Sequence, residues 1–300
     1  MQNKYHESVL LKEVIDLLQI KKGKKYIDAT LGGGGHAEAI LELGGEVLGI
    51  DLDQDAIDFV SERLKSQISN GKLKLIQGNF KEIDNIARLQ ELERVDGIIF
   101  DLGVSSYQIE NKNRGFSFQR EGALDMRMDQ RSGQIKANDL LNLLSREKLY
   151  EIFNKFGEEP RAHTISNAIV RTRRIKAIET NLDLLKIIKE AYGIRGQISD
   201  KTRSSISKRV FQALRIFINS ELENLEESLP KAIDILEARG RVAVISFHSL
   251  EDRIVKQSFL NFEREELGKI ITKKPIILSL EEQKTNRRGR SAKLRVFEKS

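Results

Sequence analysis

One stretch of the chain, Ile27-Asp28-Ala29-Thr30-Leu31-Gly32-Gly33-Gly34-Gly35-His36, has the residue types of a loop that holds a nucleotide-like ligand. Four consecutive glycines follow a short β-type run, and a helix-like segment, 37–43, comes next. Glycine permits positive φ angles and lets the backbone approach a ligand with no Cβ in the way. The first turn of the following helix adds free N–H groups and the positive end of a helix dipole. The loop therefore predicts a cofactor site.

Two cofactors are compatible with this loop. Residues 32–37 match the G-x-G-x-x-A pattern of dinucleotide sites, and Asp51 follows Gly32 by 19 positions, where such sites place an acid for the ribose. Residues 28–34 match D/E-x-x-x-G-x-G, the pattern of S-adenosylmethionine sites. That methyl donor has no phosphate, but an acid near the first strand can face its ammonium group. A dehydrogenase and a methyltransferase both remain open at this point.

A second group of candidate residues ends another apolar run, 95–101. It reads Asp101-Leu102-Gly103-Val104-Ser105-Ser106. In methyltransferases with a doubly wound sheet, the end of the fourth strand is where the target atom meets the methyl group. Asp101 and the Ser105–Ser106 turn are therefore candidates to accept a hydrogen bond from the target and to take its proton. His248, near the end of a later apolar run, is a further candidate.

The elements that position these residues alternate between strand and helix patterns. Strands are expected over the ranges 24–30, 46–51, 73–77 and 95–101, with helices between them. This order predicts a parallel, doubly wound α/β sheet, in which ligands bind beyond the carboxyl ends of the strands. Asp28, Asp51 and Asp101 each fall near such an end.

The alternation stops after Asp101. Residues 109–205 read as a mainly helical insertion, so the expected organisation is a core of 1–108 and 206–300 with an inserted substrate-recognition domain of 109–205. A long helical pattern over 208–237 predicts a helix with a bend near Pro230. A fifth strand is expected over 240–247. A closing pair of strands is expected over two further ranges, 269–278 and 292–297.

Composition narrows the class of protein. The chain has no cysteine, which excludes disulfides and thiolate metal sites. It has no long apolar run and no signal-peptide pattern, so a cytoplasmic protein with no membrane contact is expected. The net charge is only +6, but basic residues gather in three stretches, 161–176, 195–215 and 284–295. Such clusters favour a polyanionic partner.

Several single residues fit contact with a nucleic acid. Phe116 and Phe118 lie in a loop flanked by glycine and arginine, where one of them could stack on a base or both could anchor the insertion. The expected phosphate contacts are Arg114, Arg127, Arg253 and the 288–290 segment.

The motifs, taken together and in order, resemble those of the RsmH/MraW family of ribosomal RNA small-subunit methyltransferases. The resemblance runs nearly from end to end and rests on these segments: 6–11 (HESVLL), 28–36, 101–106, 114–118 (RGFSF), 124–129 (LDMRMD), 211–216 (FQALRI), 246–253 (SFHSLEDR) and 286–295. Tyr107 and Arg287 depart from the family pattern, which commonly has proline at both places. The change at Tyr107 touches the turn beside Gln108.

The resemblance implies a Rossmann-like class I S-adenosylmethionine-dependent sheet. It implies transfer of a methyl group to the exocyclic N4 amine of one cytidine in the decoding centre (P-site) of 16S rRNA, within the small ribosomal subunit. No metal is expected, and a homodimer is possible. The implied donor contacts are Gly34, Gly35, His36, Asp51, Phe80, Asp101 and Gln108.

Two other functions remain as alternatives. One is a non-catalytic, RNA-binding ribosome assembly factor that uses the donor site only structurally. The other is the NAD-dependent dehydrogenase that the glycine pattern also permits. Intact acids at Asp28, Asp51 and Asp101 argue against a site that has lost its activity.

Overall fold

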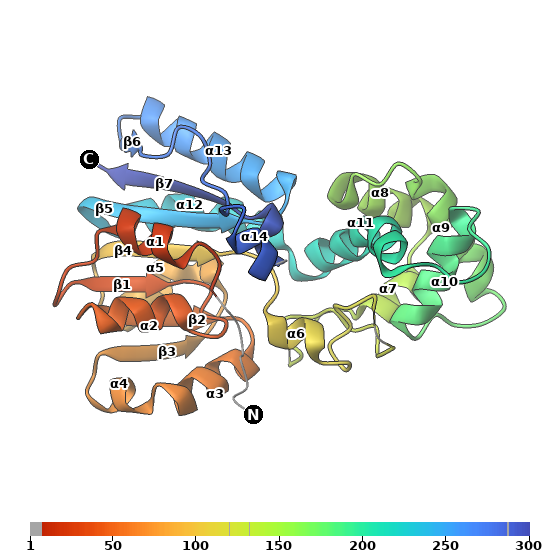
Figure 1. The fold of residues 1–300 in the computed structure, drawn as a ribbon, viewed down its shortest axis with the longest axis horizontal. Helices are drawn as coiled ribbons and strands as arrows, with labels where there is room; N and C mark the ends of the chain where they lie inside the picture. The colour runs from red at the N-terminus through yellow and green to blue at the C-terminus, as the bar shows by residue number, and fades with distance from the viewer. Residues whose placement is uncertain (1–7, 120, 132, 287) are drawn as a thin grey trace. The chain divides into compact units, whose positions relative to one another are not determined.

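The computed structural model describes residues 8–119, 121–131, 133–286 and 288–300. The chain forms two compact units (Figure 1). The first runs to Ser105 and resumes with Leu222–Ser300, and the second is Ser106–Glu221. The predicted boundary between 205 and 206 falls inside helix α11 (Asp200–Asn219), which belongs wholly to the second unit. Within the described ranges, no helix is both long and apolar enough to span a bilayer.

A seven-stranded sheet forms the centre of the first unit, in the order β3-β2-β1-β4-β5-β7-β6. The strands are β1 (Lys25–Asp28), β2 (Glu46–Asp51), β3 (Leu73–Gln77), β4 (Val95–Asp101), β5 (Leu236–Ser246), β6 (Gly268–Ile270) and β7 (Lys293–Lys299). The first five strands pair in parallel, and β7 runs antiparallel to both of its neighbours. The predicted α/β class is confirmed, and the sheet has the arrangement of a class I methyltransferase.

Helices cover both faces of this sheet because each strand is apolar on both sides. One face packs against α1 (Leu11–Leu18), α2 (Gly35–Glu42) and α3 (Gln54–Arg63). The other packs against α5 (Ile83–Leu89), α12 (Glu221–Ile235) and α13 (Ser249–Arg264). Short elements α4 (Lys65–Ser69), η1 (Phe80–Glu82), α14 (Glu282–Thr285) and η2 (Arg288–Ser291) complete the unit. Residues alternate between the two faces along β4: Ile99 faces the first layer and Phe100 the second.

Two expected elements differ from the structure. The helical pattern over 208–237 is broken at Ser220, whose φ of 49° ends α11, and not at Pro230, which lies inside α12. Burial of Leu225, Leu229 and Ile233 against the sheet holds α12 together despite the proline. The strand expected over 269–278 is limited to three residues of β6 and an isolated bridge from Ile276 to Leu294, because Pro275 has no N–H for the ladder.

The second unit is mainly helical, as expected. Its helices are α6 (Ser106–Glu110), α7 (Ala137–Leu143), α8 (Arg146–Gly157), α9 (Ala162–Arg173), α10 (Asn181–Ala191) and α11. The helices α8, α9, α10 and α11 pack on one another around buried Phe153, Ile165, Leu184 and Leu214. That this unit recognises the substrate stays a prediction.

Candidate active site

The glycine loop joins the end of β1 to the start of α2, and two of its glycines have positive φ angles: Gly32 at 50° and Gly34 at 74°. A Cβ on Gly34 would lie 2.9 Å from a methyl carbon of Val60, and one on Gly35 would lie 2.1 Å from the hydroxyl oxygen of Ser8. The loop therefore packs tightly against protein on the side where side chains would project. Only glycine gives both the conformation and the clearance.

Asp51, the last residue of β2, braces this loop. One carboxylate oxygen accepts a hydrogen bond from the N–H of Gly32 at 2.7 Å, and the other accepts from the N–H of Asp53 at 2.8 Å. Asp53 in turn caps α3 by accepting from the N–H of Asp55. The carboxylate is thus held at the carboxyl edge of the sheet, where a carboxylate oxygen can accept from more than one donor.

Asp28 ends β1 and is almost fully buried, with 1% of its surface exposed. Burial raises the pKa of its carboxyl to about 7, and the nearby negative charge of Asp51 adds to the increase. Backbone N–H groups of Thr30 and Ala37 donate to the carboxyl and lower the pKa in part. A buried carboxyl in this state gains stability from a cationic ligand placed beside it.

Thr30 connects the glycine loop to the end of β4. Its hydroxyl oxygen accepts a hydrogen bond from the N–H of Asp101 at 2.6 Å, and its own N–H donates to the carboxylate of Asp28. The β1–β4 ladder otherwise ends one step earlier, where the N–H of Ala29 donates to the carbonyl of Ile99. The threonine side chain therefore extends the pairing by one bond and fixes Asp101 relative to the loop.

The carboxyl of Asp101 lies in this buried acidic neighbourhood. Burial raises its pKa well above the usual range, and the charges of Asp28 and Glu251 raise it further. Its Oδ2 lies 3.8 Å from Nδ1 of His36, a ring in the first turn of α2 that is 4% exposed. Its Oδ1 is buried and makes no hydrogen bond with the residues that the structure describes. Asp101 thus combines raised basicity with a buried oxygen that has no hydrogen-bond partner among the described residues.

The remaining predicted donor and acceptor residues are distributed over both units. Phe80 follows β3 and packs edge to face on Phe100, with ring centroids 5.6 Å apart. Gln108 is buried in α6 and belongs to the second unit. Ser105 is half-buried in the loop after β4, and Ser106 is the first residue of α6, with its side chain outside the described part of the structure.

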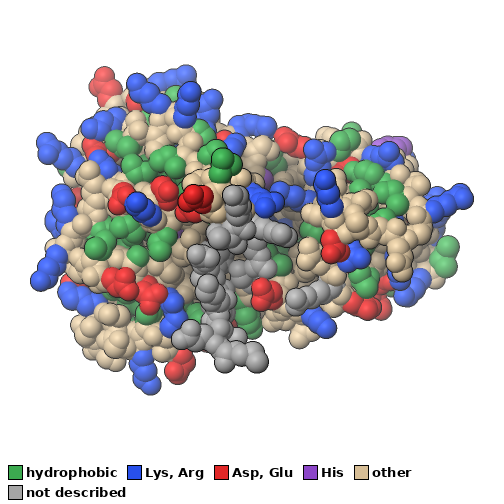
Figure 2. Space-filling model, viewed as in Figure 1, with side chains coloured by type: hydrophobic (Ala, Val, Ile, Leu, Met, Phe, Trp, Pro, Cys, Tyr) green, Lys and Arg blue, Asp and Glu red, His purple; other side chains and the backbone are tan. Residues whose placement is uncertain are grey.

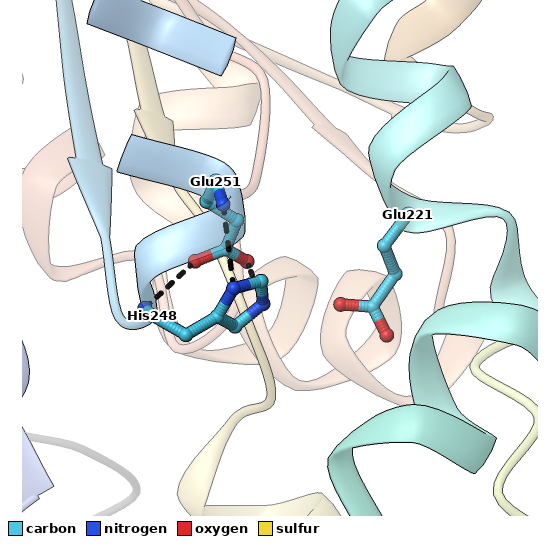
Figure 3. Close-up of side chains that lie close together, drawn as sticks. All are labelled: Glu221, His248 and Glu251. Atoms are coloured by element: carbon cyan, nitrogen blue, oxygen red, sulfur yellow. Dashed lines mark hydrogen bonds and ion pairs between the residues drawn. The ribbon is translucent and has the colours of Figure 1, made fainter. Parts of the chain in front are cut away.

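His248 has a clear structural function as the N-cap of α13 (Figure 3). Its Nδ1 accepts a hydrogen bond from the N–H of Glu251 at 3.3 Å, and the N–H of His248 donates one to the Glu251 carboxylate, which makes a capping box. An accepting Nδ1 places the ring proton on Nε2, which lies 3.1 Å from Oε1 of Glu251. The cap occupies Nδ1, the ring nitrogen that would otherwise be free to take a proton.

A basic segment reaches the same edge of the sheet as the three aspartates. Strand β7 begins at Lys293, which pairs with Ser246 at the carboxyl end of β5. Lys293 and Arg295 both bind the carboxylate of Asp252 in the first turn of α13, at 3.0 and 2.7 Å. Just before them, Gly289 packs against Val9, the neighbour of the Ser8 that fills the space beside Gly35. The 288–295 segment is therefore close to the glycine loop.

Two of the expected phosphate contacts are wrong. Arg114 is buried, and its guanidinium donates to the backbone carbonyls of Arg127 and Met128. Arg127 is bound to Asp125 through two parallel hydrogen bonds of 2.8 and 2.9 Å, which lower the pKa of that carboxyl. Both arginines stabilise the loop itself. Arg253 and Arg290 are exposed, as phosphate contacts must be.

The other basic stretches also include paired side chains. Arg171 pairs with Glu190, Arg215 forms a double hydrogen bond with Glu221, and Arg161 lies over the ring of Tyr192. Figure 2 shows lysines and arginines spread over the visible surface of each unit, with acids among them. Charge counts along the chain therefore overstate the number of cations available to a polyanion.

The two phenylalanines proposed for stacking lie within the second unit. Phe116 is buried, and Phe118 packs edge to face on Phe211 of α11 at 5.5 Å. Both contacts fit the interpretation that these rings anchor the insertion. Sequence reasoning missed Thr30 and Glu251 as contributors to the site. The Thr30 hydroxyl takes the place of a ladder carbonyl and Glu251 is a buried capping acid, and neither function leaves a pattern in the sequence.

Comparison with known proteins gives the family. Residues 3–300 match the model of the MraW methylase family. A protein named ribosomal RNA small subunit methyltransferase H from Lachnospira eligens is 42% identical, over 98% of this chain and 97% of its own length. Proteins of the same name from Coprothermobacter proteolyticus (43% identical, 98% and 96% covered) and Oenococcus oeni (41% identical, 98% and 98% covered) also match.

Three observations lead to one assignment. The sheet has a glycine loop of the methyl-donor type, it has acids at its carboxyl edge, and the sequence matches these relatives over nearly the whole chain. This chain belongs to the MraW methylase family.

Proposed function

We propose that this protein transfers a methyl group from S-adenosylmethionine to the exocyclic N4 amine of a cytidine in the decoding centre of 16S rRNA, acting on the small ribosomal subunit. The observation that carries the proposal is the cluster of Asp28, Asp51 and Asp101 beside the glycine loop, with the basic 288–295 segment at the same edge. The relatives named above, which carry a ribosomal RNA methyltransferase name, support the choice of substrate.

The loop fits this donor better than a dinucleotide. A pyrophosphate would bring negative charge next to buried Asp28 and Asp101, whose pKa values are already raised by burial and mutual repulsion. The donor carries an ammonium group at its methionyl end and a positive charge on its sulfur, and it supplies the activated methyl group. Asp28 would face the ammonium group, Asp51 the ribose, and the backbone of Gly34 and Gly35 would line the bound molecule.

The chain's own residues then have two tasks. The first is alignment, because the amine of cytosine is a weak nucleophile that must be held in line with the methyl carbon and the leaving sulfur. The second is removal of a proton from the amine. His36, Phe80, Gln108, Ser105 and Ser106 are proposed to orient donor and target, and the absence of a metal stays a prediction.

The test uses small ribosomal subunits that lack this methylation, with donor carrying a radiolabelled methyl group. We expect labelled 16S rRNA and, after digestion to nucleosides, label in N4-methylcytidine. Label on another position of the base or on protein would overturn the proposal, and binding to subunits without any label would favour an assembly factor.

The Asp101→Asn variant keeps the size of the side chain and removes the base. We expect turnover to fall by about 10²- to 10⁴-fold, the usual contribution of general base catalysis. His248→Gln serves as the comparison, because an amide oxygen can still cap α13. Near-normal turnover of Asp101→Asn combined with loss of activity in His248→Gln would refute the assignment of the proton acceptor.

A further inference from the structure

Phe247 occupies a distinctive place at the end of β5, next to the strand that carries Asp101. Asp101 pairs with Ile245, and the N–H of Leu102 donates to the carbonyl of Ile245 at 3.0 Å, so Phe247 lies two residues beyond the partner of Asp101. Ile245 and Phe247 both pack on the layer that contains α2. Because alternate residues of a strand share one face, Phe247 and Asp101 lie on the same face of the sheet.

The ring of Phe247 is held firmly but only half-covered. Its backbone N–H donates to the buried carboxylate of Glu251 at 2.8 Å, which ties it to the start of α13. On one side it lies over Gly103, where a Cβ would be 3.5 Å from the ring. Gly103 has a φ of 107°, so this position both needs and has glycine. The rest of the ring remains partly exposed.

We propose that Phe247 is the stacking platform for the target base, an inference that rests on the proposed function. A base whose exocyclic amine reaches Asp101 must place its flat ring near the ends of β4 and β5. Phe80, the other aromatic ring assigned to this edge, packs on the opposite face of the sheet. A single-stranded base is commonly held by stacking on an aromatic side chain. Phe247 supplies that surface on the face that carries Asp101.

The experiment compares three variants in steady-state methylation of small subunits. Phe247→Leu keeps most of the packing and removes the aromatic face, whereas Phe247→Tyr keeps the ring. Phe59→Leu is the matched control, because Phe59 is also a half-buried phenylalanine that packs on the same layer, but from α3. Donor affinity and the thermal midpoint of each protein are measured alongside.

We expect Phe247→Leu to lower kcat/KM for subunits roughly 5- to 150-fold, the range for loss of one base–aromatic stack. Phe247→Tyr should stay within about threefold of wild type, and all variants should bind the donor like wild type. If Phe247→Leu loses no more activity than Phe59→Leu, the stacking role is refuted while the methyltransferase function stands. If the wild-type protein labels no RNA, the proposed function fails and the stacking role fails with it.

Discussion

The buried carboxyl of Asp28 should make the stability of the unliganded protein depend on pH in an unusual direction. Its pKa is raised to about 7 in the folded protein, against an ordinary value of 3.8 in the unfolded chain. Between these two values the folded state binds more protons than the unfolded state. Stability therefore falls as pH rises through this window, by up to about 1.4 kcal/mol per pH unit. Above pH 7 the contribution of Asp28 is constant.

The Asp28→Asn variant tests this directly because an amide cannot ionise. Its oxygen can still accept from the N–H of Thr30, but its NH₂ group would face the N–H of Ala37 and lose that hydrogen bond, at a cost of about 1–2 kcal/mol. At pH 5 the wild type has already lost about 1.6 kcal/mol, because Asp28 of the unfolded chain ionises above pH 3.8, so the two proteins should have similar stability. From pH 5 to pH 8 the wild type loses about 3 kcal/mol at Asp28 and the variant loses none there. At pH 8 the variant should thus be the more stable protein, by about 2–3 kcal/mol.

Urea unfolding of both proteins at pH 5 and pH 8, without donor, measures the effect. The raised pKa of Asp101 adds its own slope to both proteins, and this slope is smaller in the variant because the charge of Asp28 contributes to that pKa. Carboxyls with lowered pKa values, such as Asp125 and Asp252, lose their stabilising effect only at lower pH. A variant that is destabilised equally at both pH values would show that Asp28 is ionised throughout, and the account of this site as a buried, protonated carboxyl would be wrong.

Three further predictions follow from the same contacts. Thr30→Val leaves the N–H of Asp101 without an acceptor and should lower the free energy of unfolding by about 1–3 kcal/mol, whereas Thr30→Ser should restore it; equal urea midpoints for the two variants would contradict this. Arg114→Leu should destabilise the protein by about 1–3 kcal/mol and leave the salt dependence of subunit binding unchanged. Arg290→Ala should leave the melting temperature unchanged and reduce by about one the slope of log binding constant against log salt concentration. Donor affinity, measured by calorimetry from pH 5.5 to 8, should rise with pH up to about 7 because the ammonium group of the donor favours ionised Asp28. A donor analogue that lacks the α-ammonium group should show a weaker trend, and identical trends for both would count against the assignment.

Much of the first unit could be predicted from the sequence because its signals are local. Strands β2, β3 and β4 have the predicted bounds, and the glycine loop lies between β1 and α2 as expected. The break at Ser220 could not be predicted, because a serine in the left-handed conformation carries no turn signature of the kind that glycine gives. The bend predicted near Pro230 was wrong for the opposite reason. A local signal was present, but the packing of α12 on the sheet overrides the local preference of proline.

The candidate site was predictable in residue identity and not in contacts. The sequence shows that Asp28, Asp51 and Asp101 end three strands, but only the structure shows that their hydrogen bonds and pKa values differ. Asp51 is held by two backbone N–H groups, while Asp28 and Asp101 have raised pKa values. Arginines present the same difficulty. A guanidinium buried against two carbonyls and one exposed to solvent are the same letter in the sequence.

The charges of this protein are separated within one edge of the sheet, and this separation bears on how two substrates of opposite charge could share it. The buried acids beside the glycine loop favour a cation, although the chain as a whole carries +6. Arg290, in the segment before β7, is basic and exposed. Salt screens exposed charges strongly and buried ones weakly. Affinity for RNA should therefore fall steeply with added salt, with each lost phosphate contact lowering the slope, while donor affinity changes little. This difference would distinguish a donor pocket built on buried carboxyls from one that depends on surface charge.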